Sequence, residues 1–249
     1  MKLNIKYIIT ILSLFISFCI QAQRPEFAVQ ANLINTFFHK TNKSDFSNYF
    51  IKSHSKRNVG FSILMNSRLS PKLLVVSGIG FQTKKYKLNF SQTNIESNYS
   101  FQPRIDAFEI PVLLDYRVFK INEGSSIHFR SGTIISINKH TRNTLKDNGN
   151  SSPFSTINII ISDNWSTIVS PDVYGEVSLI KQNKNSKFEL GLSYQYGLIN
   201  MHKFNYLITY TGNGSEQQYK GIIHPRLSYI ALRYSFYPKW LNYSNENPN

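Results

Sequence analysis

The chain of 249 residues is long enough for one domain, and its composition is both basic and aromatic. It carries 28 Lys and Arg against 14 Asp and Glu, a formal net charge of +14, together with 15 Tyr and 18 Phe. Its single cysteine, Cys19, excludes an internal disulfide framework and a thiolate metal site.

The N-terminus has the pattern of a secretory signal peptide. Two lysines precede the apolar run 8–20, which is shorter than the roughly twenty residues that a membrane-spanning helix needs. Ala22 then supplies the small residue of a cleavage site before Gln23. We predict a signal peptide over residues 1–22, so that cleavage removes Cys19; an uncleaved anchor is the alternative.

From Gln23 onward, apolar residues recur at every second position in eight segments. Side chains of a strand alternate between the two faces, so this spacing predicts eight strands, each with one apolar face. These apolar faces are Phe27–Leu33, Val59–Met65, Leu73–Phe81, Phe108–Val118, Ile127–Ile137, Val173–Leu179, Phe188–Leu198 and Ile230–Phe236.

The segment AFEIPVLLDYRVF (107–119) raises the question of what covers such an apolar face. Its alternate positions Glu109, Asp115 and Arg117 hold all the charges, and Pro111 lies on the same charged face. One structure that fits is a soluble sandwich with the apolar face in its core. The other is a membrane barrel with the apolar face in lipid and the charges in the lumen. Because proline lacks an N–H, Pro111 also predicts a bulge or a locally weakened ladder.

The lengths of the connections favour the barrel. Short polar turns at 70–72, 121–126 and 181–186 alternate with long polar loops near 39–57, 87–104, 140–166 and 203–224. This alternation, with an even strand count, is typical of an outer-membrane barrel. We predict an all-β, eight-stranded antiparallel up-and-down transmembrane β-barrel over 23–238, with the long loops on the extracellular side and a polar C-terminal tail at 239–249. Ten strands are the alternative if 148–166 crosses the membrane, whereas 206–221 resembles an outward hairpin that turns at Gly212–Gly214.

Two strands carry a resemblance to a known family. FEIPVLLDYRV (108–118) is similar to a strand of PorT-like outer-membrane β-barrel proteins of the Bacteroidota, and LRYSF (232–236) fits their last strand. Asp115 replaces the basic or polar residue more usual there. The resemblance implies localisation in the bacterial outer membrane after export, and insertion by the barrel-insertion machinery. It implies little about activity.

The polar face of the predicted strands supplies charges of both signs to the lumen. An eight-stranded barrel is just wide enough for side chains to fill, and unpaired charges are costly in a low dielectric. We therefore predict a salt-bridged lumen charge network that acts as a plug, with a narrow ion path or a hidden acid–base site as alternatives. The predicted network consists of Arg68, Glu109, Asp115, Arg117, Arg130, Asp172, Glu176, Glu189 and Arg233.

The excess positive charge falls largely in the first two long loops. Basic loops at the cell exterior suit the phosphates of lipopolysaccharide, although solubility alone is an equal explanation. Nucleic acid is not an expected partner of an exported barrel. The residues expected to face lipopolysaccharide are Lys40, Lys43, Lys52, Lys56, Arg57, Lys84, Lys85 and Lys87.

No motif indicates catalysis, a cofactor or a metal. His128 and Ser131 point to opposite faces of one strand, so they cannot form a dyad. His140 and Ser170 are candidate rim residues for a lipid A hydrolase, but ordinary polar rim residues explain them better. We expect a non-enzymatic outer-membrane protein with a structural or interaction role, in contact with outer-membrane lipid and an envelope protein partner. The runners-up are a small barrel enzyme acting on lipid A and a narrow pore.

Overall fold

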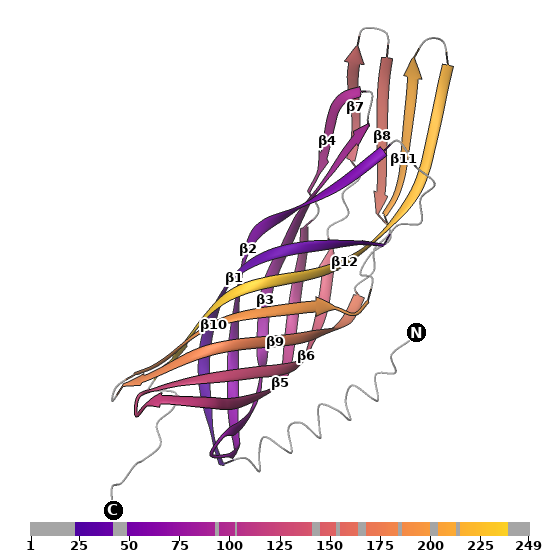
Figure 1. Cartoon of the computed structure of the whole chain (residues 1–249). Helices are drawn as coiled ribbons and strands as arrows, with labels where there is room; N and C mark the ends of the chain where they lie inside the picture. Colours follow the sequence, from indigo (N-terminus) through magenta and orange to yellow (C-terminus); the bar gives the residue numbers. More distant parts are fainter. Residues whose placement is uncertain are drawn as a thin grey trace, which may run out of the picture.

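A computed structural model gives the fold of the chain as a single closed barrel with hairpins projecting from one end (Figure 1). It describes residues 23–41, 49–92, 95–102, 104–140, 145–152, 155–163, 168–183, 186–199, 204–212 and 215–238. The predicted signal peptide, 1–22, and the polar tail, 239–249, lie outside these residues, so both stay predictions. Across the described ranges, no helix has the length and apolarity required to cross a membrane.

All described elements are strands, in agreement with the period-two patterns of the sequence. Their bounds are β1 Gln23–Thr41, β2 Tyr49–Ser70, β3 Leu73–Gln92, β4 Ile95–Phe101, β5 Arg104–Asn122, β6 Ser125–His140, β7 Leu145–Ser152, β8 Ser155–Asp163, β9 Ile168–Asn183, β10 Ser186–Gly197, β11 Phe204–Gly212 and β12 Ser215–Tyr237.

Eight of these strands close on themselves. The order is β1-β2-β3-β5-β6-β9-β10-β12, and β12 pairs with β1 to complete the ring. Every pairing in the ring is antiparallel. The predicted eight-stranded antiparallel barrel is confirmed, and a closed ring leaves no free edge.

The strands are strongly staggered around the ring. Pairing leads from Asn138 of β6 to Ala107, Gln82 and Gly60, and then through Asn32, Arg233, Gly191 and Ser178 to His128. One circuit therefore returns to β6 at a position ten residues from where it began. Such a stagger tilts the strands relative to the barrel axis, typically by about 35–45°.

The two faces of the wall are as predicted from the sequence. Outward apolar side chains are exposed on every barrel strand, for example Leu33 at 51%, Phe61 at 61% and Leu192 at 60%. Inward positions are buried and mostly polar. An exposed apolar exterior around a polar interior is the arrangement of a barrel whose solvent is lipid.

The long connections lie at one end of the barrel as predicted, but most of their described residues are paired strands and not open loops. β2 and β3 stay paired up to Tyr49 and Gln92, and β4 adds to β3. Beyond the ring, β7 pairs with β8, β8 with β11, and β11 with the first half of β12. Pairing satisfies backbone groups that an open loop would leave to water. We call this side of the barrel the hairpin end, and the side of the turns at 71–72 and 123–124 the turn end.

Residues 157–161 and 206–221 both belong to the projecting sheet. Ile157–Ile161 lies within β8, which belongs to the projecting sheet rather than to the ring, so it adds no membrane crossing. The outward hairpin predicted at 206–221 is confirmed, since Gly212 pairs with Ser215 across its turn.

Pro111 weakens the sheet on one side only. On the β6 side, Pro111 pairs with Ile134 and the ladder is continuous. On the β3 side, the pairing stops after Ser77–Val112 and resumes at Gly80–Glu109 in the same register. The ladder is locally open without a bulge, as expected for a residue without an N–H.

Candidate functional site: the charged barrel interior

The interior of the barrel holds a continuous set of buried polar side chains. They come from the inward positions of the ring strands, where the sequence alternates polar residues with the lipid-facing apolar ones. The buried charged members are Lys84, Glu109, Asp115, Arg130, Asp172, Glu176, Glu189 and Arg233. They form two groups at different heights, joined by tyrosine, glutamine and serine side chains.

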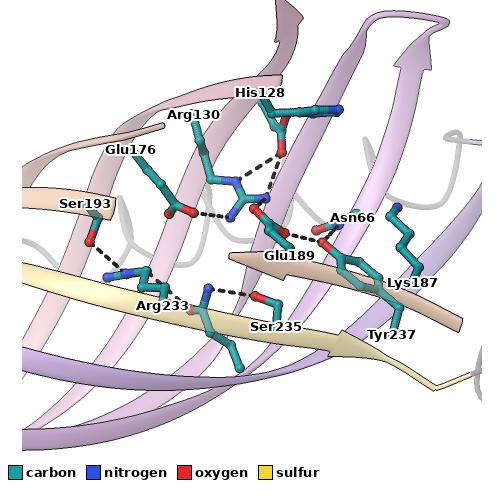
Figure 2. Close-up of polar contacts among 12 residues, drawn as sticks. Asn66, His128, Arg130, Glu176, Lys187, Glu189, Ser193, Arg233, Ser235 and Tyr237 are labelled. Atoms are coloured by element: carbon teal, nitrogen blue, oxygen red, sulfur yellow. Dashed lines mark hydrogen bonds and ion pairs between the residues drawn. The ribbon is translucent and has the colours of Figure 1, made fainter. Parts of the chain in front are cut away.

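The group nearer the turn end is the Arg130 cluster, consisting of Arg130, Asp115, Glu176 and Glu189 (Figure 2). The Nη2 atom of Arg130 lies 2.7 Å from Asp115 Oδ2 and 2.9 Å from Glu189 Oε1. Its Nη1 atom lies 3.5 Å from Glu176 Oε1. One guanidinium thus binds carboxylates from β5, β9 and β10, which uses the several donors that distinguish arginine from lysine.

Neighbouring polar groups complete the coordination of these carboxylates. His128 Nδ1 lies 2.6 Å from Asp115 Oδ1. Tyr237 donates a 2.6 Å hydrogen bond to Glu189 Oε2, and Asn66 donates to the Tyr237 hydroxyl at 3.0 Å. Tyr174 donates to Glu176. Each bond offsets part of the cost of burying a charge.

The group nearer the hairpin end is the Lys84 cluster, consisting of Lys84, Glu109 and Asp172. Lys84 Nζ lies 3.1 Å from Glu109 Oε1 and 3.9 Å from Asp172 Oδ2. Ser136 Oγ bridges the two carboxylates at 3.1 and 3.0 Å. A single buried ammonium therefore serves two carboxylates that face each other.

Uncharged side chains connect the Lys84 cluster across the lumen. Gln195 Nε2 donates to Asp172 Oδ2 at 2.6 Å, and Gln82 Nε2 donates to the Tyr229 hydroxyl at 2.7 Å. The Tyr229 hydroxyl lies 3.3 Å from Glu109 Oε1. Tyr229 is on β12 and Glu109 on β5, four strands apart in a ring of eight, so this contact spans the full width of the barrel.

Arg233 fills the space between the two groups. Its Nε donates to Ser193 Oγ at 2.9 Å, and its Nη1 donates to Gln30 Oε1 at 3.3 Å (Figure 2). The guanidinium carbon lies 4.6 Å from the centroid of the Tyr174 ring, a cation–π distance. Its contacts bind β12 to β1, β9 and β10.

The described interior holds more acids than bases. Three cations, Lys84, Arg130 and Arg233, face five carboxylates, while His128 adds a positive charge only when protonated. No group of side chains suited to hold a metal occurs in the described part of the chain. Chemically, the arrangement is a set of cross-links between facing strands.

Seven of the nine residues predicted for the lumen charge network are buried inside the barrel. The two exceptions correct the prediction: Arg68 is exposed and Arg117 is half-buried, and neither takes part in the ion pairs seen between described residues. Both lie near the turn end, where water solvates a charge without a partner. The alternation of side chains along a strand shows which face of the wall a residue lies on, but not its position along the barrel axis.

Lys84 is the clearest correction among the predicted lipopolysaccharide-facing residues, since only 1% of its side chain is exposed and it lies inside the barrel. Lys84 is two residues from the inward-facing Gln82, so it lies on the same face of β3. Extending the predicted strand past Phe81 would have placed it in the lumen. Arg57 and Lys85 are exposed, whereas Lys56 and Lys87 are half-buried, all on strands rather than loops. Lys43, and the side chains of Lys40 and Lys52, lie outside the described residues.

The serine considered for lipid A hydrolysis is also inside the barrel. Ser170 is fully buried, and its hydroxyl accepts a 3.0 Å hydrogen bond from Asn138 Nδ2. Ser170 lies near the hairpin end of β9 but points into the lumen, so it is not the lipid-facing serine considered for hydrolysis. The side chain of His140 lies outside the described residues. Sequence reasoning also missed the cross-linking role of Tyr174, Tyr229 and Tyr237, because tyrosine is common on both faces of a barrel wall.

The sequence comparison agrees with the fold. A family model described as "Outer membrane protein beta-barrel domain" matches residues 21–203. The chain belongs to this family of outer-membrane β-barrel proteins, and its place is the outer membrane.

Distant similarities are to solved structures, whereas no curated protein matches the chain. The translocator domain of the autotransporter NalP from Neisseria meningitidis has 8% identity and a TM-score of 0.31, covering 90% of this chain and 92% of that chain. The transport unit of the autotransporter AIDA-I from Escherichia coli has 7% identity and a TM-score of 0.28, covering 87% and 91%. The TodX monoaromatic hydrocarbon channel deltaS2 mutant has 8% identity and a TM-score of 0.23, covering 92% of each chain.

Proposed function

We propose that this chain is a non-enzymatic outer-membrane protein in which a sealed barrel anchors an external interaction surface. Its role is adhesion, envelope integrity, or service as an accessory part of a secretion or uptake complex. On the resemblance of residues 108–118 and 232–236, we further propose that it is a PorT-like protein of the Bacteroidota, exported by a cleaved signal peptide and inserted by the barrel-insertion machinery.

The observation that carries this proposal is the contact between Glu109 and Tyr229 across the full width of the barrel. This 3.3 Å contact divides the lumen at that height, and Gln82 and Gln195 bond to the same tyrosine from two further strands. The Arg130 cluster adds a second layer of cross-links below it. A filled interior supports an anchor over a pore.

The hairpin end supports an interaction role. Strands β4, β7, β8 and β11 all lie outside the ring and project on one side (Figure 1). Projecting strands present side chains and backbone to a partner without disturbing the membrane-embedded wall. We propose an envelope protein as that partner, together with outer-membrane lipid and lipopolysaccharide.

The test is a complementation experiment in a strain that lacks the gene. The full chain and a variant without residues 145–163 and 204–221 are expressed, and sensitivity to detergent and attachment to surfaces are measured. We expect only the full chain to restore both properties. A heat-modifiable gel shift serves as the control that the shortened barrel still folds.

Full rescue by the shortened chain would move the function into the barrel itself. Lipid A from the same strains is compared by mass spectrometry. A change in acylation that depends on this chain would replace the proposal with the enzymatic alternative.

A further inference from the structure

Four neighbouring strands carry exposed cations on the outer wall near the hairpin end. The basic row, as we call it, consists of Arg57 on β2, Lys85 on β3, Arg104 on β5 and Lys139 on β6. All four are exposed; the side chain of Arg104 is 54% accessible. They face away from the lumen, unlike Lys84, which is adjacent in sequence to Lys85.

The strand register brings three members of the basic row to one height. Lys85 pairs directly with Arg104, and Lys139 pairs with Asp106, two residues from Arg104. A stagger of ten residues around eight strands shifts the ladder by slightly more than one residue per strand. This shift almost cancels the offset between Lys139 and Arg104. Arg57 lies about two residues, one repeat of the pleat, closer to the turn end than the other three.

The charges of the basic row are poorly compensated within the protein. Like charges directly opposite each other on paired strands are destabilising, and Lys85 and Arg104 are such a pair. Asp106 is the acid beside them; its Oδ1 accepts from Arg104 Nε at 3.0 Å and from Thr83 Oγ1 at 2.9 Å. Among the described residues, Arg57, Lys85 and Lys139 make no ion pair. Three of the four cations are therefore available to an anion from outside the chain.

The depth of the basic row fits lipid headgroups. Phe81 and Phe108 are paired on the same strands, are exposed to lipid, and lie four residues below Lys85 and Arg104. Four residues span roughly 13 Å along the strand, and less along the axis because the strands are tilted, so Lys85 and Arg104 lie beyond this apolar band toward the headgroups. On the other side of the barrel, the exposed large side chains near the corresponding strand ends are the apolar Val169, Leu198 and Ile199. Among the described side chains, the exposed positive charge at this height therefore lies on β2, β3, β5 and β6.

We propose that the basic row is a binding site for the phosphates of lipopolysaccharide on the outer wall of the barrel. Cations on four adjacent strands span roughly 14 Å, which suits a headgroup with more than one phosphate better than a phospholipid with one. Arg104 and the lysines bind phosphate oxygens through charge-assisted hydrogen bonds, and Asp106 orients Arg104. This inference rests on the proposed orientation with the hairpin end outward.

The test compares two variants of the full chain that lose the same charge. One is Lys85→Gln/Arg104→Gln/Lys139→Gln; the other removes three exposed lysines near the turn end, Lys72→Gln/Lys120→Gln/Lys181→Gln. Both are purified in mild detergent, and retained lipopolysaccharide is quantified by native mass spectrometry over a titration. We expect the basic-row variant to bind about ten-fold more weakly or worse, and the turn-end variant to bind as the unmodified chain does.

The probes separate the sources of phosphate. Lipopolysaccharide, its dephosphorylated form, phosphatidylglycerol and inorganic phosphate are titrated in parallel. Weak binding of the dephosphorylated form supports the proposal. Equal binding of phosphatidylglycerol or of inorganic phosphate would overturn it, as would equal loss in the two variants.

Complementation is also measured for the two charge variants, and lipopolysaccharide binding is also measured for the hairpin deletion. If the basic-row variant loses lipopolysaccharide binding but still restores both phenotypes, the binding site is supported. The proposed function is then decided by the hairpin deletion alone. Failure of complementation by the hairpin deletion with lipopolysaccharide binding intact separates the two in the other direction.

Discussion

Arg130 donates from both Nε and Nη2 to a single oxygen of Asp115, Oδ2, at 3.2 and 2.7 Å. The other oxygen of Asp115 contacts His128, and Arg130 is left with donors for Glu189 and Glu176. The pair therefore joins β5 and β6 to β9 and β10 through one buried guanidinium. Its removal leaves three carboxylates without their shared cation.

Replacement of Arg130 by alanine is expected to destabilise the barrel by about 3–5 kcal/mol, the cost of an uncompensated buried charge. The measurement is urea unfolding in detergent micelles, followed by the heat-modifiable gel shift. Arg117→Ala is the matched control, because Arg117 is half-buried near the turn end and is expected to change stability by less than about 0.5 kcal/mol. Similar effects of the two substitutions would contradict a special role for the Arg130 cluster.

A methyl group is expected to be tolerated at Gly175 but not at Gly78. A Cβ at Gly78 would lie 2.1 Å from the carbonyl oxygen of Ile63 on the neighbouring strand, whereas a Cβ at Gly175 would meet nothing within 4 Å. Gly78→Ala should therefore cost at least about 1–3 kcal/mol, because backbone must move. Gly175→Ala should leave the unfolding midpoint unchanged. Equal midpoints for the two variants would show that β2 and β3 are not packed as closely as described.

The unmodified barrel is expected to show no discrete conductance steps in planar lipid bilayers. Glu109→Ala removes a contact across the interior, and Arg233→Ala removes a large side chain that fills it, so we expect brief openings from these variants only. Ser235→Ala is the control, since its contact with Gln30 is a single bond along the β1–β12 seam. Regular steps from the unmodified protein would favour the narrow-pore alternative.

Closure of the ring is expected to depend on the last half of β12. Outer-membrane fractions extracted in mild detergent should contain a compact form that migrates faster before boiling than after it. A chain that ends at Arg226 lacks most of the pairing with β1 and β10, and we expect it to lose this shift. A chain that ends at Pro238 keeps β12 entire and should retain it. Absence of any shift, with the protein in the periplasm, would point to a soluble sandwich.

The alternation of apolar and polar residues was sufficient to predict the ring, because the outer and inner faces of the wall differ strongly in polarity. Outward residues such as Val59, Leu192 and Leu232 are apolar and exposed on the outer wall, and inward ones such as Gln30 and Ser193 are buried and polar. The same parity correctly placed Glu109, Asp115 and Arg130 inside. The hairpin that joins β11 to β12 was also predictable, since Gly212 and Gly214 are typical turn residues.

The sequence did not predict where strands end or how deep a side chain lies. Residues 87–104 look like a loop because polar residues are plentiful, yet β3 and β4 pair through most of that segment. Above the membrane, a strand needs no apolar face, so the periodic signal disappears although the backbone pairing continues. The same loss of signal concealed Lys84, and the missing height concealed the positions of Arg68 and Arg117.

The continuity of β12 has a mechanical consequence. Residues 215–223 form the edge of the projecting sheet with β11, and the rest of the same strand closes the ring through thirteen residue pairs with β1, from Thr41–His224 to Val29–Phe236. A pull on the projecting sheet therefore travels along one unbroken backbone into the seam. The hydrogen bonds there lie across the direction of pull, so they share the load and must yield together rather than one at a time. A tether built in this way resists detachment under flow or tension far better than one attached through a loop.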